Sequence, residues 1–339
     1  MATDYASAVR AGTMAAGRLH RELGMRELVE THGGNIDVFG AISELGLPLM
    51  LRPLKGLLGA YLPSPVPGLL ITTERRMSIQ RFTAAHELGH YTMRHLPSLD
   101  DESILRRMPT SPEPTGLFQE TEADAFAVAF MMPKWLILAH AARQGWQVND
   151  FRRQNVVYQL SLRLGASYEA TCRTLQRYAL IDDSTPIALL DTKPKPPKPL
   201  KVDLLQDYQP ENYHGDVWLL TAKDAGTRID GSRDDTFVLR LNEHAGGGYV
   251  WDFDQLEASG FAILRDRREN ADHEAIGGPV VRRVTAAVGD ARWGHVTIAE
   301  RRPWAPEPAH ASLDIDFDVT GPEQKGLSRA ERRLRFEEA

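Results

Sequence analysis

The sequence predicts an α+β protein with two domains, a mainly helical domain with a small sheet followed by an all-β sandwich. Its 339 residues exceed what one hydrophobic core usually supports. A proline-rich segment at residues 192–199 interrupts the chain, and the apolar pattern changes there from helical spacing to strand-like alternation. We therefore expect four parts: a first domain at 1–185, a linker at 186–203, a sandwich at 204–321 and a charged tail at 322–339.

Composition and charge exclude several classes of protein. The chain is 42% hydrophobic and 25% charged, as in ordinary globular proteins. A net charge of −6 gives no whole-chain attraction to nucleic acid or to a membrane surface. The N-terminus lacks an apolar signal segment and no run of 18 apolar residues is present, so we expect no membrane and no direct nucleic-acid partner, in a cytoplasmic protein. The single Cys172 lies in an apolar-periodic segment, which predicts a core residue.

The elements of the first domain follow from the spacing of apolar residues. Helices are expected within residues 1–30, 81–93, 119–131 and 157–181, and strands at 49–51 and 69–71. The helix pair at 157–181 has helix-turn-helix-like spacing around Gly165, but completing the core of the first domain is the favoured role.

The motif that carries most information is His-Glu-Leu-Gly-His at residues 86–90. On a helix His86 and His90 lie about one turn apart on one face, so both imidazoles can converge on one metal ion. Zinc suits neutral imidazole ligands, and Glu87 can act on a zinc-bound water as general base without being a ligand. Such a pattern also occurs by chance, and its helical context favours the metal site. Gly89 indicates that something packs close to the backbone there.

A catalytic zinc ion needs a third protein ligand, and the helix expected at residues 119–131 offers one. Glu120 and Asp124 are four residues apart and share a helix face. We expect Glu120 to bind the metal and Asp124 to accept a hydrogen bond from the far nitrogen of a ligand histidine. Glu122 is a rival ligand, for which an acidic first turn stabilised by the helix dipole is the favoured alternative.

The runs RFTAAHELGHY and ETEADAFAVAFMMP resemble the ImmA/IrrE family of bacterial and phage metallopeptidases, and the similarity extends over about residues 25–182. In this gluzincin-type family the Glu of an E-x-x-x-D motif is the third ligand, which here is Glu120. The resemblance implies a Zn²⁺-dependent endopeptidase that makes limited cuts in a transcriptional repressor, often one with a helix-turn-helix domain. Manganese is the alternative metal. Gluzincins also supply an oxyanion donor, for which His95, Tyr91 and Tyr158 are candidates.

Beyond residue 192 the pattern of apolar and turn-forming residues becomes typical of strands and turns. The prolines of the linker favour an extended, semi-rigid spacer. Strands are expected at 216–220, 236–241, 280–288, 295–299 and 313–319, which together suggest a sandwich. The last residues, 324–339, mix both charges densely and predict a solvated helical tail.

Three loops of the sandwich resemble those of chagasin-type inhibitors, immunoglobulin-like domains that block papain-type cysteine proteases. The loops contain Gly248, Tyr249 and Trp251, then Gly277 and Gly278, then Arg302, Pro303 and Trp304. Gly247 stands where the family has the threonine that enters the protease cleft, so the resemblance supports the fold better than inhibition. We expect a protein-binding module; in the alternative the chain is a regulatory or cysteine-protease-inhibiting protein whose metal site is secondary. Simple turn chemistry, with Trp251 and Trp304 in a core, is the structural alternative for these loops.

Overall fold

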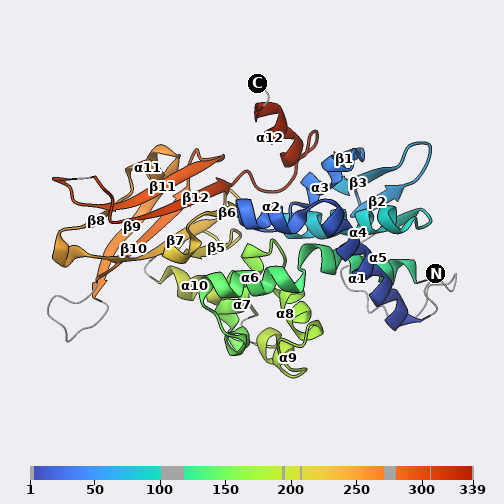
Figure 1. The fold of residues 1–339 in the computed structure, drawn as a ribbon, viewed down its shortest axis with the longest axis horizontal. Coiled ribbons are helices and arrows are strands. Elements are labelled where there is room, and N and C mark those ends of the chain that lie inside the picture. The colour runs from blue at the N-terminus through green and yellow to red at the C-terminus, as the bar shows by residue number, and fades with distance from the viewer. Residues whose placement is uncertain are drawn as a thin grey trace.

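In the computed structural model the described residues are 4–100, 118–192, 195–206, 208–270, 280–305 and 307–337. The protein has a mainly helical N-terminal half and a sheet-rich C-terminal half (Figure 1). The α+β prediction is confirmed at this level, while the immunoglobulin-like type of the second half stays a prediction.

Helices dominate the N-terminal half, close to where apolar spacing predicts them. They are α1 (Tyr5–Glu22), α2 (Met25–His32), α3 (Val38–Glu44), α4 (Met77–Met93), α5 (Gln119–Met131), α6 (Lys134–Gln144), the short 3₁₀ turn η2 (Val148–Arg152), α7 (Gln154–Arg163) and α8 (Tyr168–Arg177). The pair α7 and α8 completes the core, as favoured, because Val157, Leu160 and Leu175 are fully buried. Cys172 is also fully buried, and burial raises the pKa of its thiol to about 12.

A four-stranded sheet lies beside these helices, in the order β1-β3-β2-β4. Its strands are β1 (Leu49–Arg52), β2 (Gly59–Leu62), β3 (Gly68–Thr72) and β4 (Ser98–Asp100). β1 and β3 are parallel and were predicted from their apolar runs, whereas β2 pairs antiparallel with both β3 and β4. The sheet packs against α4 through β2 and β3.

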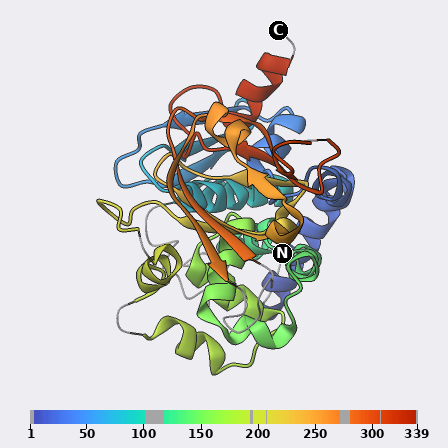
Figure 2. The same ribbon diagram turned by 90° about the vertical axis from the view of Figure 1, so that its left-hand side faces the viewer.

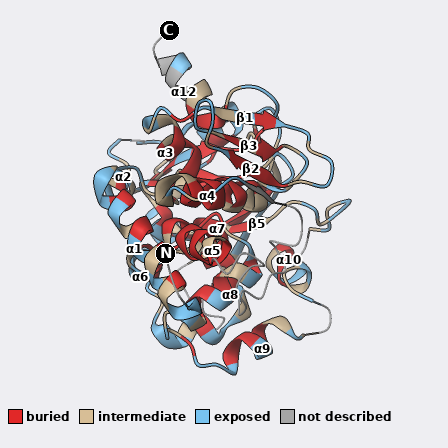
Figure 3. Ribbon diagram, turned by 90° about the vertical axis from the view of Figure 1, so that its right-hand side faces the viewer, coloured by how far each residue is buried: buried red, intermediate tan, exposed pale blue. Residues whose placement is uncertain are grey.

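Two glycines allow the inner helices to approach closely. Figure 3 shows that α4 and α5 are mostly buried at the centre of this half. A Cβ atom added to Gly12 of α1 would lie 2.1 Å from the Glu122 carbonyl oxygen of α5. A Cβ atom added to Gly89 of α4 would lie 3.0 Å from the ring of Phe126, which confirms the close packing expected there. The contact at Gly12 requires a residue without a side chain, whereas a methyl group at Gly89 would require the Phe126 side chain to shift by a few tenths of an ångström.

One described stretch, Gln119–Gln144, has the length and hydropathy of a membrane span. It consists of α5 and α6, which are separated at Pro133, and 61% of its apolar window is buried within the protein. Burial of this extent is what a core helix requires.

The C-terminal half contains two four-stranded sheets. One has the order β5 (Val217–Leu220), β7 (Thr236–Glu243), β10 (Val280–Val288) and β9 (Phe261–Asn270); the other has β6 (Thr227–Asp230), β12 (Ala311–Asp318), β11 (Trp293–Arg301) and β8 (Val250–Asp252). Short helices η3 (Ala222–Asp224), η4 (Ala245–Gly247) and α11 (Asp254–Ala258) connect them. The rings of Phe261 and Phe317, one from each sheet, meet edge to face at 5.0 Å. All five predicted strands are present.

The linker predicted at 186–203 contains helical segments where an extended spacer was expected, and its residues 193 and 194 lie outside the described residues. Residues 185–205 contain two helices, α9 (Thr185–Leu190) and α10 (Lys198–Leu205). Pro199 lies in the first turn of α10, where a missing N–H costs nothing. Leu200 and Leu205 are buried, and the Lys201 ammonium donates to the Gly215 carbonyl at 2.6 Å. Packing of these side chains therefore overrides the local preference of the prolines for an extended chain.

Buried polar contacts join the two halves. Arg81 of α4 pairs with Asp230 of β6 at 3.2 Å, and Arg163 of α7 pairs with Asp224 at 2.7 Å. The Gln159 side chain donates to the Val217 carbonyl and accepts from the Leu219 N–H, each at 2.8 Å. Seen from the side of the sheets, the strands lie directly in front of the helices (Figure 2). The halves therefore form one packed body.

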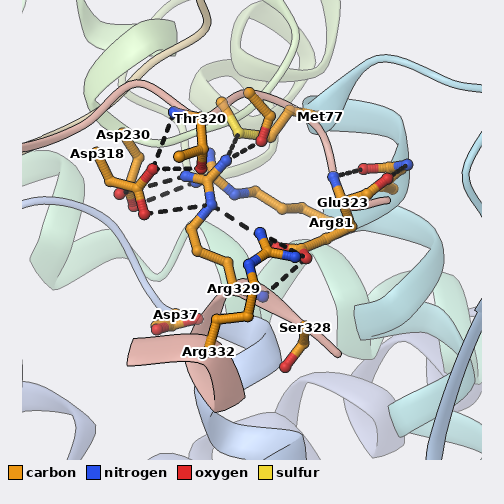
Figure 4. Close-up of polar contacts among 12 residues, drawn as sticks. Asp37, Met77, Arg81, Asp230, Asp318, Thr320, Glu323, Ser328, Arg329 and Arg332 are labelled. Carbon is orange, nitrogen blue, oxygen red and sulfur yellow. Dashed lines mark hydrogen bonds and ion pairs between the residues drawn. The ribbon is translucent and has the colours of Figure 1, made fainter. Parts of the chain in front are cut away.

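The charged tail is only partly solvated, which corrects another prediction. Helix α12 (Arg329–Glu337) begins inside the protein, where Arg329 and Glu323 are buried. Figure 4 shows the Arg329 guanidinium among carboxylates of both the tail and the strands. It lies 3.5 Å from Asp230, 3.5 Å from Asp318 and 3.7 Å from Glu323. The tail thus closes the same ionic cluster that contains Arg81.

Candidate metal centre

Three side chains from two helices converge at the centre of the N-terminal half. Helix α4 presents His86 and His90, and α5 presents Glu120. The two Nε2 atoms lie 2.9 Å apart, His86 Nε2 lies 3.2 Å from Glu120 Oε2, and His90 Nε2 lies 3.6 Å from Glu120 Oε1. Both histidines are fully buried, and Glu120 is 8% exposed. These are the three ligands that the sequence pattern proposes.

The size of this triangle suits a zinc ion. A tetrahedral ion with bonds of about 2.0–2.1 Å separates its ligands by about 3.3–3.4 Å, close to the three distances observed. Two imidazoles and one carboxylate are also the donor types zinc accepts at catalytic sites. Burial raises the pKa of Glu120, but the two adjacent imidazoles of His86 and His90 outweigh this effect and lower the pKa. The carboxylate is therefore ready to bind a cation.

A second set of side chains orients the two imidazoles. Asp124 Oδ1 lies 2.9 Å from His86 Nδ1, and the hydrogen bond predicted between them stays a prediction. His95 Nδ1 lies 3.0 Å from His90 Nδ1, and His95 Nε2 lies 2.9 Å from Glu122 Oε2. Partners at both Nδ1 atoms favour a proton there, which leaves each Nε2 with a lone pair directed at the shared point.

His95 and Glu122 therefore have roles that differ from those considered from the sequence. His95 uses both ring nitrogens between His90 and Glu122, so it is not placed as an oxyanion donor. Burial, reinforced by the neighbouring His90, lowers the pKa of His95 to about 3. A neutral His95 can accept from His90 and donate to Glu122, which makes Glu122 an indirect support rather than a rival ligand.

The candidate general base, Glu87, has its side chain within the protein. It follows His86 on α4 and is fully buried. Strand β2 passes close to it at Gly59, where an added Cβ atom would lie 2.7 Å from Glu87 Oε1 and 2.5 Å from the Thr83 methyl group. Gly59 was not identified from the sequence, although a glycine inside a strand is a known sign of close backbone approach.

The two tyrosine candidates have different surroundings. Tyr158 donates its hydroxyl to Asp216 at 3.0 Å and accepts from the Val217 N–H at 2.9 Å. Its hydroxyl thus takes part in the contact between the halves, and the oxyanion role considered for it stays a prediction. Tyr91 is half-buried on α4, with its ring 6.2 Å from that of Tyr61 on β2. Its role as oxyanion donor stays a prediction.

The inhibitor-like loops lie in the C-terminal half, away from this centre. Trp251 is buried, but Trp304 is 73% exposed, so the alternative that both tryptophans fill a core is wrong for Trp304. The Arg302 guanidinium lies 4.4 Å from the Tyr249 ring centroid, and a Cβ atom added to Gly248 would meet the Trp304 ring at 2.5 Å. The first and third loops therefore pack together. Pro303 beside them is exposed, and Gly277 and Gly278 lie outside the described residues.

Comparison with protein families gives one match within the N-terminal half. Residues 44–176 match the family model of the IrrE N-terminal-like domain, Peptidase_M78. The match includes the whole donor triangle, confirms the N-terminal resemblance and supports a peptidase. Comparison with curated proteins gives no match.

Three solved structures show what the chain is similar to. The cysteine protease inhibitor EhICP2 from Entamoeba histolytica is 19% identical, with 32% of this chain and 99% of that chain covered, at a TM-score of 0.28. PbICP-C in complex with falcipain-2 is 15% identical, with 33% and 98% covered, at a TM-score of 0.22. A Mycobacterium tuberculosis transcriptional regulator is 15% identical, with 81% and 75% covered, at a TM-score of 0.34. The first is an inhibitor of the kind that the C-terminal loops resemble.

Proposed function

We propose that the chain is a zinc-dependent endopeptidase that makes limited cuts in a protein substrate. The observation that carries this proposal is the buried triangle of His86, His90 and Glu120, with donor atoms 2.9–3.6 Å apart and Glu87 next to it on α4. The family match over residues 44–176 supports the same reaction class.

The residues of the chain divide the work of hydrolysis among them. A zinc ion held by the triangle would supply Lewis acidity to a scissile carbonyl group and to a water molecule. Glu87 accepts a proton from the attacking water and passes it to the leaving amine. Asp124 and His95 hold the imidazoles in orientation, and burial keeps bulk water from the donors.

The substrate class we propose is a helix-turn-helix transcriptional repressor, met in the cytoplasm. The support is the resemblance of the two motif segments to a family that cuts such repressors. Any repressor-like protein found to be encoded beside this chain's gene is the first substrate to test.

The test compares wild type with Glu87→Gln on that repressor, with fragments identified by intact-mass spectrometry. Wild type should produce two discrete fragments, and the variant should cut at least about 100-fold more slowly with an unchanged zinc content. Equal cutting by the two proteins contradicts the proposal.

A second candidate function concerns the C-terminal half, which we propose binds a protein partner through the loops at 244–249 and 302–304. Trp304 is the most exposed large apolar side chain among the described residues, and Arg302 and Gly248 hold the two loops together. Exposed aromatic and arginine side chains are typical of protein-binding surfaces.

A papain-type cysteine protease is the finer version of this partner. It is tested with the full-length Glu87→Gln chain, which should not cleave the protease, and with the same chain carrying Trp304→Ala. Inhibition at micromolar concentration that Trp304→Ala weakens supports this partner. If neither chain inhibits the protease, a papain-type partner is rejected.

A further inference from the structure

A second group of metal-binding side chains lies among the loops of the C-terminal half. It consists of His244, which follows β7, Glu300 of β11, and His310, which precedes β12. One ligand atom from each lies within 4.8 Å of the others. His244 Nδ1 is 3.0 Å from Glu300 Oε2, and the two imidazole rings meet at 4.4 Å between centroids.

The charge of Glu300 is unusually placed. The residue is fully buried, and His244 is its only ionic partner in the described part of the chain. The neighbouring buried carboxylate of Glu243 has two arginine partners, Arg268 at 2.5 Å and Arg282 at 3.2 Å. A buried carboxylate is costly without a compensating positive charge. Among the described residues Glu300 lacks the arginines that compensate Glu243, and the His244 imidazole is the group in contact with its carboxylate.

We propose that His244, Glu300 and His310 bind one divalent transition-metal ion of the zinc class. Two imidazoles and a carboxylate form a donor set that zinc accepts, with a fourth position open to water. Glu300 is held by the rigid strand and by the His244 N–H, which donates to Oε1 at 2.5 Å. The exposed side chains of His244 and His310 can rotate so that their ligand nitrogens reach the distance of about 3.3–3.4 Å between ligands of a tetrahedral zinc ion.

The position of the site gives the ion a structural consequence. His310 is fixed near Glu300 by its N–H, which donates to the Glu300 carbonyl at 2.8 Å, and its ring lies 4.6 Å from that of Tyr249. An ion bound here joins the loop at 244–249 to the connection between β11 and β12. It therefore stiffens the two loops that carry the exposed aromatic surface.

The test is the stoichiometry of zinc binding to the full-length chain by isothermal titration calorimetry, after dialysis against a chelator. His310→Gln and His244→Gln each remove an exposed ligand and should leave the fold intact. His295→Gln is the matched control. Like His244 and His310, His295 is an exposed histidine; it lies on β11, 2.8 Å from a carboxylate oxygen of Asp316. Hydrogen exchange at residues 244–249 is the second measurement.

Each ligand variant should bind one zinc ion fewer than wild type at micromolar zinc, and His295→Gln should bind the same number as wild type. Zinc should also slow hydrogen exchange at 244–249 in wild type and not in His310→Gln. Equal stoichiometry in wild type and His310→Gln overturns the proposal. The result does not depend on whether the site at His86 binds zinc. If that site is empty, the number of zinc ions per chain falls equally in all the proteins compared.

Discussion

Single residues around the candidate centre explain why its donors converge. The left-handed turn at Arg94, with φ of 56°, ends α4 and directs the His95 N–H to the His90 carbonyl at 3.0 Å. This turn brings the His95 ring back against His90, and Glu122 then holds it from α5. The orientation of one ligand thus depends on a loop residue and on a second helix.

Gly59 provides a direct prediction at this scale. In Gly59→Ala the new methyl group would overlap Glu87 Oε1 and the Thr83 methyl group, so the general base must move. We expect cleavage to fall at least about 10-fold, because small misplacements of catalytic groups are costly, while zinc content stays that of wild type. Gly17→Ala on α1 is the control, since its nearest neighbour would be a flexible Arg21 side chain at 3.8 Å. Full activity of Gly59→Ala would show that β2 does not position Glu87.

Local spacing made some of the site predictable and left other parts hidden. The pairs His86–His90 and Glu120–Asp124 were predicted because residues four apart on a helix share a face, and Glu87 was predicted from its place in the motif. His95 as an orienting partner and Gly59 as a spacer were not found. Their roles depend on how a turn and a strand pack against α4, and no periodicity in the sequence records that packing.

At the scale of elements, α6 is attached to the core through a buried histidine. His140 Nε2 lies 3.1 Å from the Gly34 carbonyl oxygen, to which it can donate. Burial, together with the charge of Arg163, lowers the pKa of His140 to about 3. The imidazole is therefore neutral in the folded protein at neutral and mildly acidic pH.

This pKa predicts a pH dependence of stability. Because the folded-state pKa lies below the unfolded value of about 6.5, the stabilisation is complete above pH 6.5 and is lost as pH falls toward 3. His140 should contribute a slope of about 1.4 kcal/mol per pH unit to the free energy of unfolding within this window. The free energy of unfolding, measured by urea titration at several values from pH 7 to 5, should depend less steeply on pH in His140→Gln than in wild type. The control His295→Gln, changed at an exposed site, should keep the wild-type dependence on pH. An unchanged slope in His140→Gln would contradict this account.

Strands with an apolar run were predicted well, and strands without one were not. β1, β3 and five of the eight described strands of the C-terminal half follow from such runs. β2 begins with glycine, β6 and β8 are short and partly polar, and the ten-residue β9 is charged beyond Leu264, so none of these was predicted. In α10 the prolines suggested an extended chain, but buried Leu200 and Leu205 and the Lys201 contacts favour a helix.

For the whole molecule, the main finding is that the two halves are not independent. The pair Arg81–Asp230 joins residues 149 positions apart, and Arg329 of the tail reaches the same carboxylate (Figure 4). Such contacts leave no trace in local sequence, so the sequence predicted a boundary near residue 192 but not the packing of the two halves against each other.

This packing predicts a single unfolding transition. Calorimetry of the full-length chain should show one cooperative peak, in contrast to the two expected for domains on a spacer. Asp230→Ala leaves two buried arginines short of a partner and should lower stability by about 3–5 kcal/mol while keeping one peak. Arg26→Ala, which breaks an exposed pair with Glu30, should cost less than about 1 kcal/mol. Two separate peaks in wild type would contradict the shared core.

The central claim is that Glu120, and not Glu122, completes a metal site with His86 and His90. The most direct test is the zinc content of wild type, Glu120→Gln and Glu122→Gln after identical dialysis, with affinity measured by competition. Glu120→Gln should hold one zinc ion fewer than wild type. Glu122→Gln should hold the wild-type number with an affinity reduced by about 10- to 100-fold, because it only orients His95. Wild-type zinc content and affinity in Glu120→Gln would contradict the account.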